Sequence, residues 1–203
     1  MAGTTTNYGF NYPTSTDLVK DGATAMQTLA TNVDTTLFTA LGGAYPGLRL
    51  IKKQTIGSGV SSVAVTSAFS ATYDNYKIIV SGGVASTASD LQLSLTGGTS
   101  VYSYGILYVA FGSSSPAAVT ATNAASFVFA GNATVDTLDM NCDVKDPFNA
   151  RYTTFKSQNA SNTLSGASTA IHKAASSFTG FTITPSAGTL TGGTIYVYGY
   201  GVS

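Results

Sequence analysis

The sequence is poor in charge and lacks two residue types altogether. Charged residues make up 9% of the 203 residues, all nine acidic residues are Asp, and the chain has neither Glu nor Trp. Helical proteins normally draw on Glu and Lys for their exposed faces, so this composition argues against a mainly helical fold. The formal net charge is zero, which excludes the basic footprint of a nucleic-acid-binding protein.

Cysteine and long apolar runs are also scarce. The single cysteine, Cys142, excludes an internal disulfide, so we expect no dependence on an oxidising compartment. No run of about 18 apolar residues is present, so we expect no membrane-spanning helix. The first residues, MAGTTT, have neither a basic start nor an apolar stretch, and we therefore expect no secretory signal.

What is abundant favours β-structure. Ser and Thr together number 55, with 22 Gly and 12 Tyr, and β-branched and aromatic side chains fit a pleated, half-buried surface. After Gly42-Gly43 the sequence becomes a series of short apolar runs separated by Gly, Pro, Asp and Asn turn signals. The spacing predicts an antiparallel β-sandwich of jelly-roll type over residues 44–203. The predicted strands are 48–56, 60–66, 76–81, 90–96, 102–111, 125–130, 134–142, 150–157, 163–173, 178–184 and 193–202.

Residues 1–13 form a polar arm without a period, which composition alone would class as disordered. Three aromatic residues, Tyr8, Phe10 and Tyr12, are the side chains expected to hold it in place. Two arrangements are open at this point. The arm either docks on another protein or packs on its own chain.

Residues 14–43 predict one helix. Thr14 and Asp17 have the spacing of a capping box, and Gly42-Gly43 supplies the stop. An apolar stripe runs along this segment and is compatible with a short trimeric coiled coil; the alternative is a helix lying on its own β-domain. The stripe consists of Val19, Met26, Leu29, Val33 and Leu37. About 25 helical residues would reach roughly 40 Å.

Two stretches resemble bacteriophage virion proteins. Residues 7–37 (NYGFNYPTSTDLVKDGATAMQTLATNVDTTL) are similar to N-terminal segments of phage tail and fibre proteins. Residues 50–82 and 180–200 resemble the β-sandwich modules of fibre and minor structural proteins, whereas the section 83–179 matches nothing specific. The resemblance implies a homotrimeric, non-enzymatic structural protein that is anchored through its N-terminus and exposed on the exterior of the particle.

The residues offer little for catalysis. His172 is the only histidine and lies in a predicted strand, where a structural role is the default. The acidic stretch comprises Asp136, Asp139, Asp143 and Asp146; of these, Asp139 and Asp143 share a strand face and are a candidate carboxylate pair or cation site. We expect no catalytic residues, no metal and no cofactor, and solvated or ion-paired aspartates remain the simpler interpretation.

Two sets of tyrosines recur at even spacing and so share one face of a predicted strand. Such a face serves either as core or subunit interface, or as a platform for sugars. The sets are Tyr102, Tyr104 and Tyr108, and Tyr196, Tyr198 and Tyr200. Two glycosylation patterns, at Asn132 and Asn159, are expected by chance in so Ser- and Thr-rich a chain.

These observations favour a short homotrimeric fibre of a phage head or tail. Its partners would be itself and another virion protein, such as the capsid, portal or tail adaptor, with assembly in the host cytoplasm. Three alternatives are weighed: a receptor-binding tip that recognises a host surface glycan, a capsid decoration (cement) protein, and, last, a depolymerase. We expect no nucleic acid partner and no membrane insertion.

Overall fold

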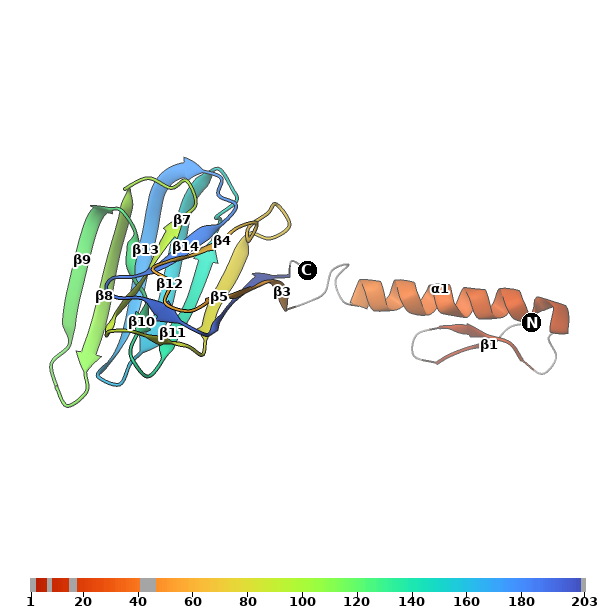
Figure 1. Ribbon diagram of the computed structural model, residues 1–203. Helices are drawn as coiled ribbons and strands as arrows, with labels where there is room; N and C mark the ends of the chain where they lie inside the picture. The colour runs from red at the N-terminus through yellow and green to blue at the C-terminus, as the bar shows by residue number, and fades with distance from the viewer. Residues whose placement is uncertain (1–2, 7–8, 15–17, 41–46, 202–203) are drawn as a thin grey trace. The chain divides into compact units, whose positions relative to one another are not determined.

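The computed structural model describes residues 3–6, 9–14, 18–40 and 47–201. The chain divides into two compact units, residues 1–47 with 201–203, and residues 48–200. The described part is mainly β, with antiparallel strands and one α-helix, as the composition predicted. We call residues 48–200 the β-unit (Figure 1).

The first unit contains a small hairpin and the helix. Strand β1 (Gly3–Thr4) pairs antiparallel with β2 (Asn11–Tyr12), and β2 packs on α1 (Gly22–Ala40), which follows the 3-10 turn η1 (Val19–Asp21). The hairpin turn is closed by the Thr5 side chain, which accepts a hydrogen bond from the Phe10 amide at 2.9 Å. The arm is therefore a hairpin on its own chain and not a single extended segment.

The helix begins later than its sequence predicted. Leu18 is extended and the regular helix starts at Gly22, so Thr14 is not its cap; Asp17, the other half of the predicted capping box, lies outside the described residues. The 19-residue helix spans about 28 Å. Two of its many threonines bond back to the preceding turn, Thr28 to the Thr24 carbonyl and Thr31 to the Gln27 carbonyl. This pattern satisfies the hydroxyls but adds little to helix stability.

The β-unit contains one branched 12-stranded sheet and a small two-stranded one. The strands of the β-unit are β3 (Leu48–Thr55), β4 (Val63–Val65), β5 (Asn75–Ser81), β6 (Val84–Ala85), β7 (Ser89–Leu95), β8 (Tyr102–Ala110), β9 (Ala117–Ala124), β10 (Phe127–Ala133), β11 (Leu138–Lys145), β12 (Arg151–Ala160), β13 (Leu164–Ser176), β14 (Phe181–Pro185), β15 (Leu190–Thr191) and β16 (Thr194–Tyr200).

The large sheet falls into two groups of strands. Eight strands run in the order β3-β16-β5-β11-β12-β13-β8-β9, with β3 and β9 at its two ends, and four run β4-β14-β7-β10. Strand β11 joins them, because its first residues pair with β10 and its later ones with β5 and β12. The side chains that alternate inward from both groups form one apolar core, which includes Tyr76, Leu93, Phe127, Phe155 and Phe181.

Serine hydroxyls complete the hydrogen bonding where β10 leaves its neighbour. Only the last residues of β10, Asn132 and Ala133, pair with β11. Farther back on β10, the carbonyl of Ala130 accepts a hydrogen bond from Ser157 Oγ at 2.7 Å, and that of Phe129 accepts one from Ser168 Oγ at 2.6 Å. Buried carbonyls need such partners, so these two buried serines on β12 and β13 have a structural role.

Candidate functional site

A row of polar and aromatic side chains crosses the outer face of the eight-stranded group of the β-unit. Strand pairing places Tyr198 of β16 opposite Lys77 of β5, Lys77 opposite Asp143 of β11, and Asp143 opposite Lys156 of β12. The row continues through Thr169 on β13 to Gly105 on β8. The intervening residues of each strand are buried, so the row follows from the two-residue period of a strand.

Asp143 is the centre of this row. Its Oδ1 accepts a hydrogen bond from Tyr200 Oη at 2.7 Å and lies 3.3 Å from Lys77 Nζ. The side chains of Lys77 and Asp143 are 21% and 43% exposed, so the pair is partly desolvated. Burial, followed by the hydrogen bond to Asp143 and its negative charge, raises the pKa of Tyr200 to about 12. The phenol therefore stays protonated and fixes the carboxylate in place.

The second tyrosine set lies on this outer face. The rings of Tyr196 and Tyr198 are stacked, with centroids 6.4 Å apart and an angle of 22° between their planes. Lys53 Nζ lies 5.8 Å from the Tyr196 ring centroid, within reach of a cation–π contact. All three tyrosines, Tyr196, Tyr198 and Tyr200, are half-buried.

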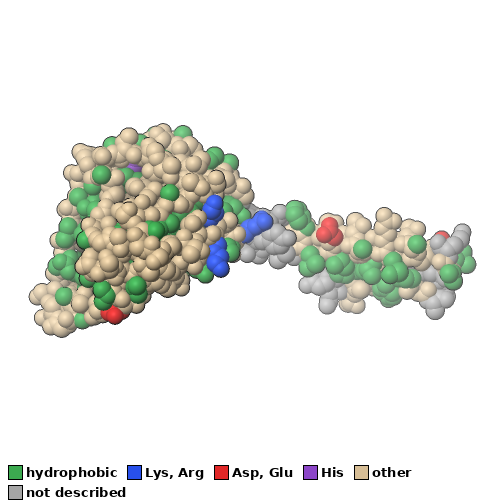
Figure 2. Space-filling view, viewed as in Figure 1, with side chains coloured by type: hydrophobic (Ala, Val, Ile, Leu, Met, Phe, Trp, Pro, Cys, Tyr) green, Lys and Arg blue, Asp and Glu red, His purple; other side chains and the backbone are tan. Residues whose placement is uncertain are grey.

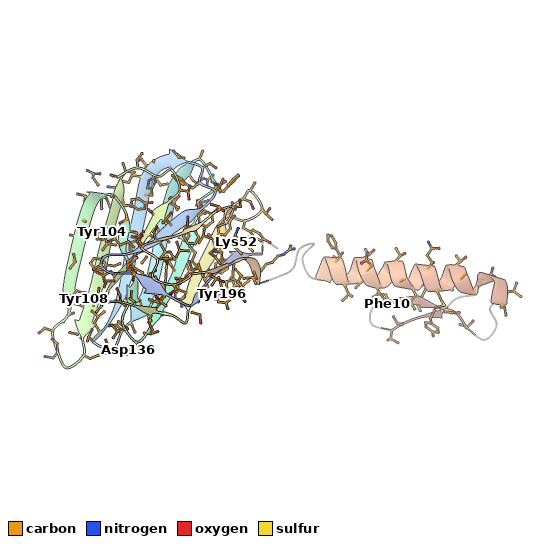
Figure 3. The ribbon with its side chains drawn as sticks, viewed as in Figure 1. Phe10, Lys52, Tyr104, Tyr108, Asp136 and Tyr196 are labelled. Carbon is orange, nitrogen blue, oxygen red and sulfur yellow. The ribbon has the colours of Figure 1, made fainter. Side chains whose placement is uncertain are left out.

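The tyrosines of β8, which are Tyr102, Tyr104 and Tyr108, lie on the core side of the sheet and not on its outer face. Tyr102 is fully buried, and its hydroxyl accepts a hydrogen bond from the Leu95 amide at 2.7 Å. Tyr104 packs against Phe127 and Phe129, and Tyr108 is half-buried on the same side of β8. Figure 3 shows Tyr104 and Tyr108 far from Tyr196, at the opposite end of the β-unit. Tyr102 therefore belongs to the core, which was one of the two expected roles, and it cannot contact a glycan.

The candidate carboxylate pair is not brought together. Asp139 and Asp143 share a face of β11 but are four residues apart, which is about 13 Å along a strand. Each also has its own partner, since Asp139 Oδ2 accepts a hydrogen bond from the Ala160 amide at 2.8 Å. Asp136 contacts Asn162, and Asp146 contacts Arg151. Within the described residues no three His, Cys or Asp side chains are placed to hold a metal ion.

His172 and Cys142 are both core residues. The imidazole lies between the rings of Tyr102 and Phe178, and its Nε2 donates to the Thr99 carbonyl at 3.2 Å. Burial lowers the pKa of His172, with the backbone of Thr99 and Ala174 opposing the shift in part. Burial also raises the pKa of the Cys142 thiol well above its usual value. Neither group is accessible to a substrate in the folded protein.

The two glycosylation patterns meet inside the protein. Asn132 and Asn159 are each 6% exposed, and Asn132 Nδ2 donates to Asn159 Oδ1 at 2.6 Å. An oligosaccharide on either nitrogen would disrupt this contact. The two asparagines therefore serve packing between β10 and β12.

The predicted helix stripe is largely exposed in the single chain. Val19, Met26 and Leu37 are 98%, 67% and 56% exposed, whereas Leu29 and Val33 are half-buried. The half-buried positions of the helix thus include the middle of the stripe, Leu29 and Val33, and the helix also packs on β2. The exposed part of the stripe is Val19, Met26 and Leu37.

The aromatic residues of the arm have different environments. Tyr12 is 43% exposed and its ring lies against Gly3, while Phe10 is half-buried (Figure 3). Tyr8 lies outside the described residues. The aromatic side chain that remains most available on the described hairpin is thus Tyr12.

Sequence analysis missed the lysines of the outer face. Lys77 and Lys156 each occupy an outward position between two buried residues, and Lys145 follows the buried Val144 at the end of β11; this alternation was the available signal. It also missed β9, which has no aromatic residue. A further feature that it missed is the segment between Asp90 and Asp136, which contains no charged residue. Charged side chains are correspondingly few on the face of the β-unit in Figure 2.

No known protein family, curated protein or solved structure matches this chain. None of the helices in the described ranges is long and apolar enough to cross a membrane.

Proposed function

We propose that the chain is a non-enzymatic structural component of a phage particle. It would form a short homotrimeric fibre on the exterior of the head or tail, anchored through its N-terminal unit, with the β-unit as a jelly-roll-type β-sandwich that projects outward. The observation that carries the proposal is the set of exposed apolar side chains on η1 and α1, since a helical segment with Val19, Met26 and Leu37 in water is incomplete as a monomer.

Two further features support a partner made of the same chain. The helix is rich in threonine and has no acidic residue in its first turn and no basic residue in its last, so it gains little from intrinsic propensity or its dipole. Within its own unit the helix packs on β2 of the short hairpin and on the 3-10 turn. Bundling of three such helices would bury the stripe and stabilise all of them.

The test of the trimer changes two stripe residues that are exposed in the single chain. Met26→Asp with Leu37→Asp places two charges in the proposed seam, and we expect sedimentation equilibrium to show a trimer for the parent and a monomer for the variant. Phe38→Asp is the matched control, because Phe38 is 62% exposed but lies about 100° around the helix from Leu37. A trimer in the double variant would exclude the helix as the oligomerising element.

Attachment to the particle is tested by deleting residues 2–12. We expect the truncated chain to remain folded but to be missing from purified particles, as judged by mass spectrometry. Incorporation at the parent level would show that attachment lies elsewhere. Labelling of particles with an antibody to the β-unit would distinguish a sparse fibre from a capsid-wide cement protein.

A further inference from the structure

Three shallow depressions on the outer face of the β-unit run end to end. The first, of 320 Å³, and the second, of 210 Å³, share Asp143 and Lys156 as lining residues. The second and the third, of 620 Å³, share Asn141 and Gln158. Together they form a continuous trough along β11 and β12, which we call the β11–β12 trough. Residues 139–145 of β11 alone span about 20 Å.

Two of the three depressions have a mainly polar lining, and the polar side chains along the trough are only partly satisfied within the chain. Asn141 and Gln158 present side-chain amides, and Lys145 and Lys156 present ammonium groups. Among the described residues none of these four side chains has a hydrogen-bond or ion-pair partner, and all four are exposed. In contrast, Asp139 and Asp143 are already held by Ala160 and by Lys77 with Tyr200. Two ammonium groups and two side-chain amides in the trough therefore remain available to bind a ligand.

The backbone of the trough cannot take part in recognition. Strand β11 pairs with β5 and β12, and β12 pairs with β11 and β13, so their main-chain groups are committed to the sheet. A peptide that adds as a strand needs a free edge and is not favoured here. An amphipathic helix needs an apolar groove, and the side chains along the trough are mainly polar.

From these contacts we propose that the β11–β12 trough binds an extended acidic polysaccharide. Its hydroxyl groups would bond to the amides of Asn141 and Gln158, and its carboxylates would pair with Lys145 and Lys156. The stacked Tyr196 and Tyr198 rings lie two strands from β11, beside Lys77, and would offer a face to sugar rings that extend past Asp143.

This inference goes beyond the structural role proposed above and does not depend on it. Binding is therefore measured on the purified full-length chain, without particles. The probes are oligomers of a polyuronate, of dextran as the neutral counterpart, and of chitosan as the cationic one, titrated by calorimetry at low salt. We expect binding of the polyuronate alone, weakened by added salt.

The test variant is Lys145→Gln with Lys156→Gln, two exposed changes that leave the core intact. We expect the affinity for the polyuronate to fall by about tenfold or more, since each substitution removes one charge-assisted contact with a carboxylate. Lys173→Gln is the control, because Lys173 is exposed on β13 but does not line the trough. A parent that binds none of the probes, equal binding of dextran, or unchanged affinity in the double variant would each overturn the proposal.

Discussion

At the scale of single residues, the buried polar groups are the most informative. His172 is fully buried, and Asn132, Asn159, Ser157 and Ser168 lie in the same interior between β10, β12 and β13. An unpaired polar group would be costly in this interior. Sequence patterns could not distinguish these residues from surface ones, because Ser, Asn and a lone His are common in both places.

His172 should make the stability of the protein depend on pH. Burial holds the pKa of His172 in the folded chain below the 6.5 of an ordinary histidine, so the unfolded chain takes up the proton first as the pH falls. Its contribution to stability is complete above pH 6.5 and is lost progressively as the pH drops toward the folded value. Urea unfolding between pH 8 and pH 5 should therefore give a steeper loss for the parent than for His172→Gln.

The comparison of slopes is what matters for His172→Gln, because the substitution is itself destabilising through lost packing against Tyr102 and Phe178. Contributions that are common to both proteins cancel in the difference. Parallel curves for the parent and the variant across this pH range would mean that the imidazole is not the responsible group.

At the scale of elements, two glycine pairs face each other where β5 ends and β16 begins. Gly82-Gly83 and Gly192-Gly193 all have positive φ angles, between 70° and 85°. A Cβ on Gly83 would lie 2.3 Å from the Gly192 carbonyl oxygen, and one on Gly193 would lie 2.3 Å from that of Gly82. Both glycine pairs must therefore lack side chains for β5 and β16 to remain paired.

Gly83→Ala should be much more destabilising than the same change at Gly97. Gly97 also has a positive φ, of 77°, but a Cβ there would meet no atom within 4 Å. Both variants bear the left-handed strain of about 1–2 kcal/mol, and only Gly83→Ala adds an overlap with backbone. Thermal melts should show a larger drop for Gly83→Ala, and equal melting temperatures would contradict the close approach.

Most elements of the β-unit could be predicted from sequence, and the exceptions have physical reasons. The strands that alternate apolar and polar residues, such as β5, β12 and β16, lie close to their predicted ranges. Strand β9 was missed because its sequence, AAVTATNA, sits at a sheet edge and buries little. The row from Tyr198 to Lys156 could not be predicted, since it depends on which strands pair and in which register.

At the scale of the whole molecule, the core belongs to one unit alone. Every residue of the apolar core lies between Ile56 and Val197. Folding and oligomerisation should therefore be separable properties of this chain.

A chain that begins at Gly47 should fold by itself and be monomeric. Because the core is retained, we expect a single cooperative melting transition close to that of the β-unit in the full-length protein. Sedimentation should show a monomer, since the helix stripe is absent. A trimeric truncated chain would place the subunit contacts on the β-unit, and an unfolded one would show that the first unit is needed for folding.

The β-unit also begins and ends at one place. Leu48 of β3 is paired with Tyr200 of β16, and the Gly201 amide donates to the Gly47 carbonyl at 2.8 Å. A module whose entry and exit are adjacent can be inserted into a surface loop of another protein without stretching its host. It can likewise be circularly permuted, with new ends opened in the exposed loop between β8 and β9. The unit is therefore a transplantable cassette for displaying its outer face on other scaffolds.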